Sequence, residues 1–295
     1  MKPQEKNIKE EKLLFQNYLI IFLDVLGQRK ALREIKTIPK DESEKKIFIK
    51  KLKNTIGRVD FLRDAFKNYF KALSTITPDT SLVPQELADE FVSSQKSNAY
   101  FYGFSDSIII AVPLMSDDEN CVAMNGVYSA LVATGGISLL AMAGKTALRG
   151  GLDVGVATQI QNNEIYGPAL ERAYYIESNI AEYPRYVLGN EFLEYLFWVE
   201  NYKYKTLRGK IAKKQAKLCK DFIIQDSDGF FMIDFLGEKL KEVAGKSIDS
   251  KIVKLAYDFI VSQHKICVEK NDIKLIPRYY RLLKYFHSRA KLWNL

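Results

Sequence analysis

Two acidic residues lie at the ends of apolar, strand-like segments of this chain. Asp24 directly follows the apolar residues that begin YLIIFLDVLGQ. Asp106 lies in YFYGFSDSIIIAVP, where Gly103 and Ser105 also favour a turn. Two carboxylates presented by neighbouring strands supply the oxygen ligands that divalent metal ions need when they bind a triphosphate. The pair therefore indicates a phosphoryl-transfer site, although each aspartate alone is also typical of a helix cap or a turn.

The segment that follows Asp24 reads VLGQR, and Gly27 marks a turn into a helix expected to begin near Arg29. Unpaired backbone N–H groups at the start of a helix bind phosphate groups. We therefore expect Gly27 and Gln28 to contact the phosphates of a nucleotide whose charge is offset by metal ions.

The elements that must position these residues alternate between apolar strand-like runs and segments with helical spacing. Strands are expected at residues 18–24, 100–104, 107–112, 147–158, 164–166 and 185–188, with a further hairpin within 222–235. Helices are expected at residues 42–72, 120–144 and 168–181 and over most of the remaining C-terminal part. This order predicts an α+β fold, a ferredoxin-like mixed or antiparallel sheet with helices packed on one face.

The domain organisation follows from the same order of elements. We expect one domain over residues 14–237, a helical insertion at about 40–98, and a helical C-terminal extension over 238–295. Residues 74–98 collect Pro, Thr, Ser and Asp, which predicts a surface excursion within the insertion.

Composition is that of an ordinary globular protein, with 295 residues, 47% hydrophobic and 27% charged. A net charge of +8 favours an anionic partner such as a nucleotide, a nucleic acid or a membrane surface, without choosing among them. Three widely spaced cysteines argue against a disulfide framework, and two histidines without nearby ligands argue against zinc. Since the first residues are charged and no secretory signal is visible, the expected location is cytoplasmic.

Residues 120–144 carry no charged side chain and are long enough to cross a membrane. The segment is rich in Ala, Gly, Ser and Thr and lies between strand-like runs, which favours a helix buried against a sheet. Its Gly135-Gly136 pair, like Gly150-Gly151 downstream, predicts close packing or strand bending rather than phosphate binding.

Four motifs in this order, FLDVLGQ, FSDSIII, LRGGLDVGVA and EIYGPALERAYYIES, resemble the successive motifs of class III nucleotide cyclases. The resemblance covers residues 19 to 188 and implies a cyclase core of ferredoxin-like fold. It implies that Asp24, Val25 and Asp106 are the metal ligands, and that two Mg²⁺ or Mn²⁺ ions bind in each active site.

The chain departs from that family where the substrate is held. The family Asn and Arg that orient the ribose and brace the triphosphate fall on Glu171 and Tyr175. The two base-reading positions fall on Tyr102 and Glu164, so the base pocket would offer an aromatic face and a hydroxyl in place of a cation. Ordinary adenylate or guanylate cyclase activity is therefore in doubt. Two candidates to replace the lost arginine are Arg172 and Arg185, each of which could equally form a surface ion pair.

A divergent branch fits these departures better, since the sequence is similar to the pyrimidine cyclases of bacterial Pycsar anti-phage systems. This resemblance implies that UTP or CTP is converted to a 3′,5′-cyclic monophosphate and pyrophosphate. It also implies a head-to-tail homodimer, with metal ligands from one protomer and base-reading residues from the other. By resemblance alone, a separate effector would sense the product, and no stable membrane or nucleic-acid partner is expected.

Two other functions remain open on the sequence alone. The changed Asn and Arg positions suit a cyclase-like protein that has lost catalysis and acts as a nucleotide sensor or dimerisation module. The basic run at residues 203–220 and the basic aromatic tail at 276–293 suit binding of single-stranded nucleic acid. Both basic segments also show helical spacing, which is typical of a solvated or packed helix.

Overall fold

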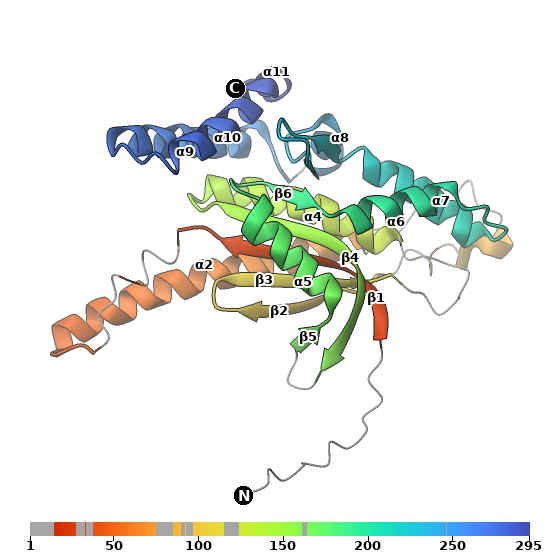
Figure 1. Cartoon of the computed structure of the whole chain (residues 1–295), viewed down its shortest axis with the longest axis horizontal. Coiled ribbons are helices and arrows are strands. Elements are labelled where there is room, and N and C mark those ends of the chain that lie inside the picture. Colours follow the sequence, from red (N-terminus) through yellow and green to blue (C-terminus); the bar gives the residue numbers. More distant parts are fainter. Residues whose placement is uncertain are drawn as a thin grey trace, which may run out of the picture.

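The computed structural model describes residues 15–27, 33, 38–74, 85–89, 92, 97–114, 124–160, 164–245 and 247–295. Its strands are β1 (Phe15–Val25), β2 (Tyr100–Phe104), β3 (Ser107–Pro113), β4 (Leu148–Ile160), β5 (Glu164–Tyr166), β6 (Tyr186–Leu188), β7 (Ile223–Gln225) and β8 (Phe231–Ile233) (Figure 1). Its α-helices are α2 (Glu42–Ser74), α4 (Met124–Ala143), α5 (Pro168–Tyr175), α6 (Asn190–Asn201), α7 (Leu207–Lys220), α8 (Glu238–Ala244), α9 (Ser250–Glu269), α10 (Ile276–Ser288) and α11 (Ala290–Trp293). A short 3₁₀-helix, η1 (Gln85–Leu87), and a π-helix, η2 (Ile176–Ile180), complete the described elements.

The strands form one sheet in the order β2-β3-β1-β4-β6-β8-β7, with β5 paired to β4. Only β4 and β6 are parallel among the pairs in the described part of the chain; the others are antiparallel. The elements β1, α2, β2, β3, α4 and β4 give the order β4-β1-β3-β2, which is the ferredoxin-like βαββαβ arrangement. The predicted α+β class and ferredoxin-like mixed sheet are therefore confirmed.

Strand β1 lies in the middle of the sheet and is buried on both faces. Leu19 and Ile21 belong to the large hydrophobic cluster that includes α2 and α4, whereas Tyr18 and Ile20 belong to a second cluster with α5. Because strand side chains alternate between faces, α5 covers the face opposite to α2 and α4. The expectation that the helices pack on one face is therefore wrong for α5.

Helix α4 is the uncharged helix at the centre of the molecule. Within the described residues it is the one helix long and apolar enough to cross a membrane, yet 83% of its most apolar window is buried inside the protein. A Cβ atom on Gly135 would meet the side chain of Leu240 in α8, and one on Gly136 would meet Tyr69 in α2. The predictions of a buried core helix and of close packing at its glycine pair are confirmed.

Helices α8 and α9 pack on α4, and α10 packs on α9 within the same hydrophobic cluster. The domain boundary at residue 238 stays a prediction. In α10, Tyr285 and Phe286 are buried together with Leu282 and Leu283, whereas Tyr280 is exposed. In α7, Ala212 and Ala216 are buried and the lysines point outward. Both basic segments thus form helices with one buried side, and most of the large apolar residues of α10 pack inside the protein.

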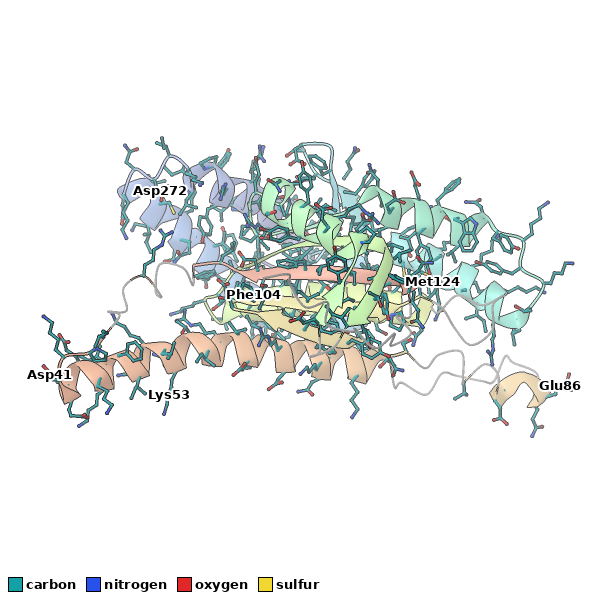
Figure 2. The ribbon with its side chains drawn as sticks, turned by 60° about the horizontal axis from the view of Figure 1, so that its bottom comes forward. Asp41, Lys53, Glu86, Phe104, Met124 and Asp272 are labelled. Carbon is teal, nitrogen blue, oxygen red and sulfur yellow. The ribbon has the colours of Figure 1, made fainter. Side chains whose placement is uncertain are left out.

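Helix α2 runs past the edge of the sheet. Its buried residues follow helical spacing and begin only at Thr55, continuing with Val59, Leu62, Phe66 and Phe70. Figure 2 shows the N-terminal end of the helix, with Asp41 and Lys53, extending beyond the sheet. The C-terminal half of α2 therefore anchors it beside β2 and β3.

Candidate functional site

The sheet brings the two aspartates of the sequence prediction side by side. Asp24 at the end of β1 is the register partner of Ser107, the residue that follows Asp106. The backbone N–H of Val25 donates a hydrogen bond to the carbonyl oxygen of Asp106, with 3.3 Å between nitrogen and oxygen. The side chain of Val25 is a buried hydrocarbon without ligand atoms, so only the backbone carbonyl of this residue could bind a metal ion.

A salt bridge network reaches Asp24 from β4 and η2. The Arg149 Nη2 atom lies 2.5 Å from Glu177 Oε1 and 3.9 Å from Asp24 Oδ2. Glu177 is almost fully buried, and its Oε1 also accepts a hydrogen bond from Arg149 Nε at 2.7 Å. Arg149 is therefore shared between two carboxylates, with the shorter contact to Glu177.

The residues predicted from the sequence include neither Arg149 nor Glu177. Arg149 is the register partner of Asp24 on β4, so correct pairing of the two predicted strands would have found it. Glu177 lies in a π-helix that continues α5, and such local widening of a helix is frequent at functional sites. No single-sequence pattern marks that element.

Helix α5 lies across β4 and connects this sheet end to the β4–β5 hairpin. At its start, a Cβ atom on Gly167 would be 2.7 Å from Ala157, and near its end one on Gly151 would be 2.2 Å from the Ala173 carbonyl. The helix and the strand can approach this closely only because glycine occupies both contact positions, Gly167 before the helix and Gly151 in β4. The helix therefore has a fixed position between the aspartates and the hairpin.

The two candidate base-reading residues lie at the other end of this helix. Tyr102 is buried in the same cluster as Ile165 of β5, and Gln159 hydrogen bonds with its side chain. Glu164 is exposed and is the register partner of Ile160. Burial, with smaller contributions from nearby tyrosines, raises the pKa of Tyr102 to about 12, so its hydroxyl is neutral at physiological pH.

The remaining predicted substrate residues occupy different surroundings. Glu171 and Tyr175 are exposed on the outer side of α5. Gly27 is exposed and has φ +87°, a left-handed conformation that favours glycine. Gln28 lies outside the residues that the structure describes.

Arg172 makes a salt bridge within the sheet-facing side of α5. Its Nε lies 2.8 Å from the buried Asp153 carboxylate, and its Nη2 donates to the Val154 carbonyl at 2.6 Å. Asp153 also accepts a hydrogen bond from the backbone of Phe192 at 2.9 Å. Arg172 therefore joins α5 to β4 and the start of α6.

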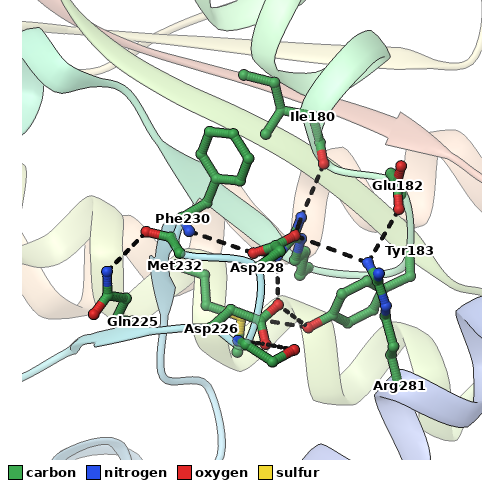
Figure 3. A network of polar contacts seen from close by, with 12 residues as sticks. Ile180, Glu182, Tyr183, Gln225, Asp226, Asp228, Phe230, Met232 and Arg281 are labelled. Carbon is green, nitrogen blue, oxygen red and sulfur yellow. Dashed lines mark hydrogen bonds and ion pairs between the residues drawn. The ribbon is translucent and has the colours of Figure 1, made fainter.

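Arg185 is fully buried at the start of β6 and lies between Asp226 and Asp228 of the β7–β8 turn. Its Nη2 is 2.5 Å from Asp228 and 2.9 Å from the Ile180 carbonyl, and Figure 3 shows this turn with Tyr183 against it. Burial alone would lower the pKa of Arg185, but hydrogen bonding and charge from Asp228 and its neighbours raise it. Arg185 is therefore committed to an internal ion network.

A pocket of about 240 Å³ opens beside Asp106, between α2 and the β2–β3 turn. One wall is apolar, and the polar groups come from Asp60, Arg63, Ser105 and Asp106. The Arg63 Nη2 donates a hydrogen bond to the Ser107 carbonyl at 3.0 Å. Arg63 of α2 therefore lies next to the predicted metal-binding turn. It is not among the residues predicted from the sequence.

The donor set at the sheet end suits a hard divalent cation. Two aspartates and a backbone carbonyl offer only oxygen atoms, and Mg²⁺ characteristically uses few protein carboxylates together with phosphate oxygens and water. Among the described residues no group of three or more His, Cys, Asp or Glu is placed to hold a metal by itself.

No protein-family model and no curated protein matches the chain. A solved structure to which it is similar is that of a class III adenylyl cyclase-like ATP-binding protein from Pseudomonas aeruginosa, with 13% sequence identity and a TM-score of 0.39. The match covers 71% of this chain and 40% of that protein, so the chain spans less than half of the other protein's length.

Proposed function

We propose that this protein is a nucleotide cyclase that converts UTP or CTP to the 3′,5′-cyclic monophosphate and pyrophosphate. The observation that supports it best is the juxtaposition of Asp24 and Asp106 on adjacent strands of a ferredoxin-like sheet. The motif order that resembles class III cyclases gives the same two residues a common role. The product would act as a second messenger in anti-phage defence.

The reaction forms a bond between the ribose 3′-oxygen and the α-phosphorus and breaks the bond from that phosphorus to the bridging oxygen of pyrophosphate. The hydroxyl proton passes to solvent. Asp24, the Val25 carbonyl and Asp106 would hold two Mg²⁺ or Mn²⁺ ions. When bound, these ions would offset phosphate charge and lower the pKa of the attacking hydroxyl. The chain itself would act by positioning and by charge stabilisation.

We assign base recognition to Tyr102 and Glu164 of a second protomer in a head-to-tail homodimer. Within one chain, Asp24 pairs with Arg149 at the start of β4, whereas Glu164 pairs with Ile160 at its end. A substrate that contacts both ends is therefore more easily bound across two chains. Glu171 and Tyr175, exposed on α5 between these ends, would face the ribose and phosphates.

The test is incubation of purified protein with ATP, GTP, CTP and UTP separately, with Mg²⁺ or Mn²⁺, and identification of products by mass spectrometry. A cyclic pyrimidine nucleotide that disappears in Asp106→Asn supports the proposal. Triphosphate binding without any product would instead favour a nucleotide sensor, and cyclic AMP or cyclic GMP as the main product would contradict the pyrimidine assignment.

A further inference from the structure

The pocket beside Asp106 contains a cation that the proposed function leaves unused. We infer that Arg63 of α2 binds the phosphate groups of the nucleoside triphosphate, as the arginine that braces its negative charge at this site. The inference rests on the proposed function, because it assumes that a triphosphate held by Asp24 on the α5 face of the sheet extends past the β2–β3 turn to Arg63 on the α2 face.

The first support is the geometry around the guanidinium. Arg63 Nη2 donates to the Ser107 carbonyl at 3.0 Å, and Nη1 lies 3.9 Å from the Asp60 carboxylate. A Cβ atom on Gly103 would lie 2.1 Å from Arg63 Nη2, so only glycine at that position leaves the guanidinium its space. The fold therefore holds the Arg63 head group within one residue of Asp106.

The second support is that the hydrogen-bonding capacity of Arg63 is incompletely used. Its Nε atom is buried and has no hydrogen-bond partner among the described residues. The Asp60 carboxylate is too distant for a hydrogen bond to Nη1, and 27% of the surface of the Arg63 side chain is exposed to solvent. The exposed part of this planar guanidinium lies at the wall of the pocket, where it suits the oxygens of a phosphate group.

The third support is the state of the other arginines near the site. Arg149 contacts Glu177, Arg172 contacts Asp153, and Arg185 is enclosed by two aspartates. Each of these three makes a contact of 2.8 Å or less with a carboxylate, whereas the nearest carboxylate contact of Arg63 is 3.9 Å. Arg63 is therefore the arginine of this group whose charge is least neutralised within the chain.

A matched control lies on the same helix. Arg58 is exposed and lines a different pocket of about 470 Å³, together with Lys53 and the end of α4. An anion attracted merely by the basic character of α2 would protect Arg58 as well as Arg63. An anion bound beside Asp106 would protect Arg63 alone.

The experiment uses the wild-type chain and inorganic tripolyphosphate with Mn²⁺ as the probe, after its Kd has been measured by calorimetry. Because tripolyphosphate has no ribose, it cannot be cyclised, and the result is independent of turnover. Arginine modification by phenylglyoxal is followed residue by residue with mass spectrometry. At ten times Kd we expect modification of Arg63 to slow about tenfold and that of Arg58 to stay unchanged.

Substitutions give a second readout. Arg63→Met should weaken tripolyphosphate binding by about tenfold or more, whereas Arg58→Met should leave it unchanged. If Arg63→Met does not fold, the protection of wild-type Arg63 decides alone. The inference is overturned if tripolyphosphate does not bind, if Arg63 is modified at the same rate with and without it, or if Arg58 is protected instead. Failure of the proposed cyclase is seen separately, as absence of cyclic product from any triphosphate.

Discussion

At the end of the sheet, Asp24 and Arg149 are 3.9 Å apart and partly exposed, whereas Arg185 is fully buried between Asp226 and Asp228. Both regions contain arginine and aspartate, but their surroundings differ. Around Arg185, a carbonyl and two carboxylates accept the guanidinium N–H groups, in the way that makes a buried ion pair tolerable. The contact between Asp24 and Arg149 is longer, and a pocket opens beside Asp106 at the β2–β3 turn.

If the proposed function holds, this difference separates residues that maintain the fold from residues that bind the substrate and its metal ions. A buried charge is costly to disturb, and both Nη atoms of Arg185 already donate to carboxylates or to a carbonyl within the chain. The partly exposed Asp24 and Asp106, with the incompletely hydrogen-bonded Arg63 beside Asp106, are the residues that we propose to bind metal ions and phosphate. Variants of Asp24 and Asp106 should therefore be tested for activity, and variants of the network around Arg185 for stability.

The largest expected effect is on turnover at the sheet end. Asp24→Asn and Asp106→Asn each remove one negative ligand while keeping side-chain size, so cyclic nucleotide formation should fall by about a thousandfold or more. The thermal midpoint of unfolding should stay close to that of the wild type. Full activity in either variant would contradict the assignment of these residues to the metal site.

The next effect is on stability at the buried network. Arg185→Met leaves Asp226 and Asp228 without their main partner, so the free energy of unfolding should fall by about 3–5 kcal/mol in urea titrations. Arg281→Met is the control, because Arg281 reaches the same turn from the surface and should contribute about 1 kcal/mol or less. Equal losses for the two variants would show that burial does not distinguish them.

A smaller effect tests whether η2 positions Asp24 through Arg149. Glu177→Gln removes the charge that holds Arg149, which would then interact more strongly with Asp24 and compete with the metal. The Mn²⁺ concentration for half-maximal activity should rise about fivefold, with little change at saturating Mn²⁺. The exposed Glu191→Gln should leave the Mn²⁺ requirement unchanged, and a parallel change in both variants would contradict the coupling.

The smallest effect is a pH dependence of stability. Burial alone would raise the pKa of Asp228, but the hydrogen bond and charge from Arg185 lower it below the ordinary value of 3.8. The ionised form is thus favoured in the folded protein, so its stabilisation is present above that value and is lost as pH falls through the folded pKa. Urea unfolding from about pH 6 down to about pH 3 should show a steeper loss for the wild type than for Asp228→Asn.

Much of the architecture was predictable because strong periodicity and clear turns mark it. The strand ending at Asp24, the hairpin at Asp106 and the uncharged helix follow from apolar patterning, and their adjacency follows from the ferredoxin-like order. The placement of α5 on the opposite face was missed, because it depends on the alternation within β1 and on the glycines of β4 beneath the helix.

The surroundings of the arginines were not predictable in the same way. Arg172 and Arg185 were candidates for phosphate binding, and the structure places both in internal salt bridges with partners far away in the sequence. No local sequence pattern indicates Arg63, because only the packing of α2 beside Gly103 and Ser107 brings it to Asp106. Contacts between elements, rather than local pattern, decide which charge remains available.

The most direct test of the aspartate site is Mn²⁺ binding measured by electron paramagnetic resonance in the presence of UTP or CTP. The wild type should bind Mn²⁺ with the nucleotide, and Asp24→Asn and Asp106→Asn should each weaken that binding by about tenfold or more. Unchanged Mn²⁺ binding in both variants, with the fold intact, would contradict the central claim that these two residues form a metal site.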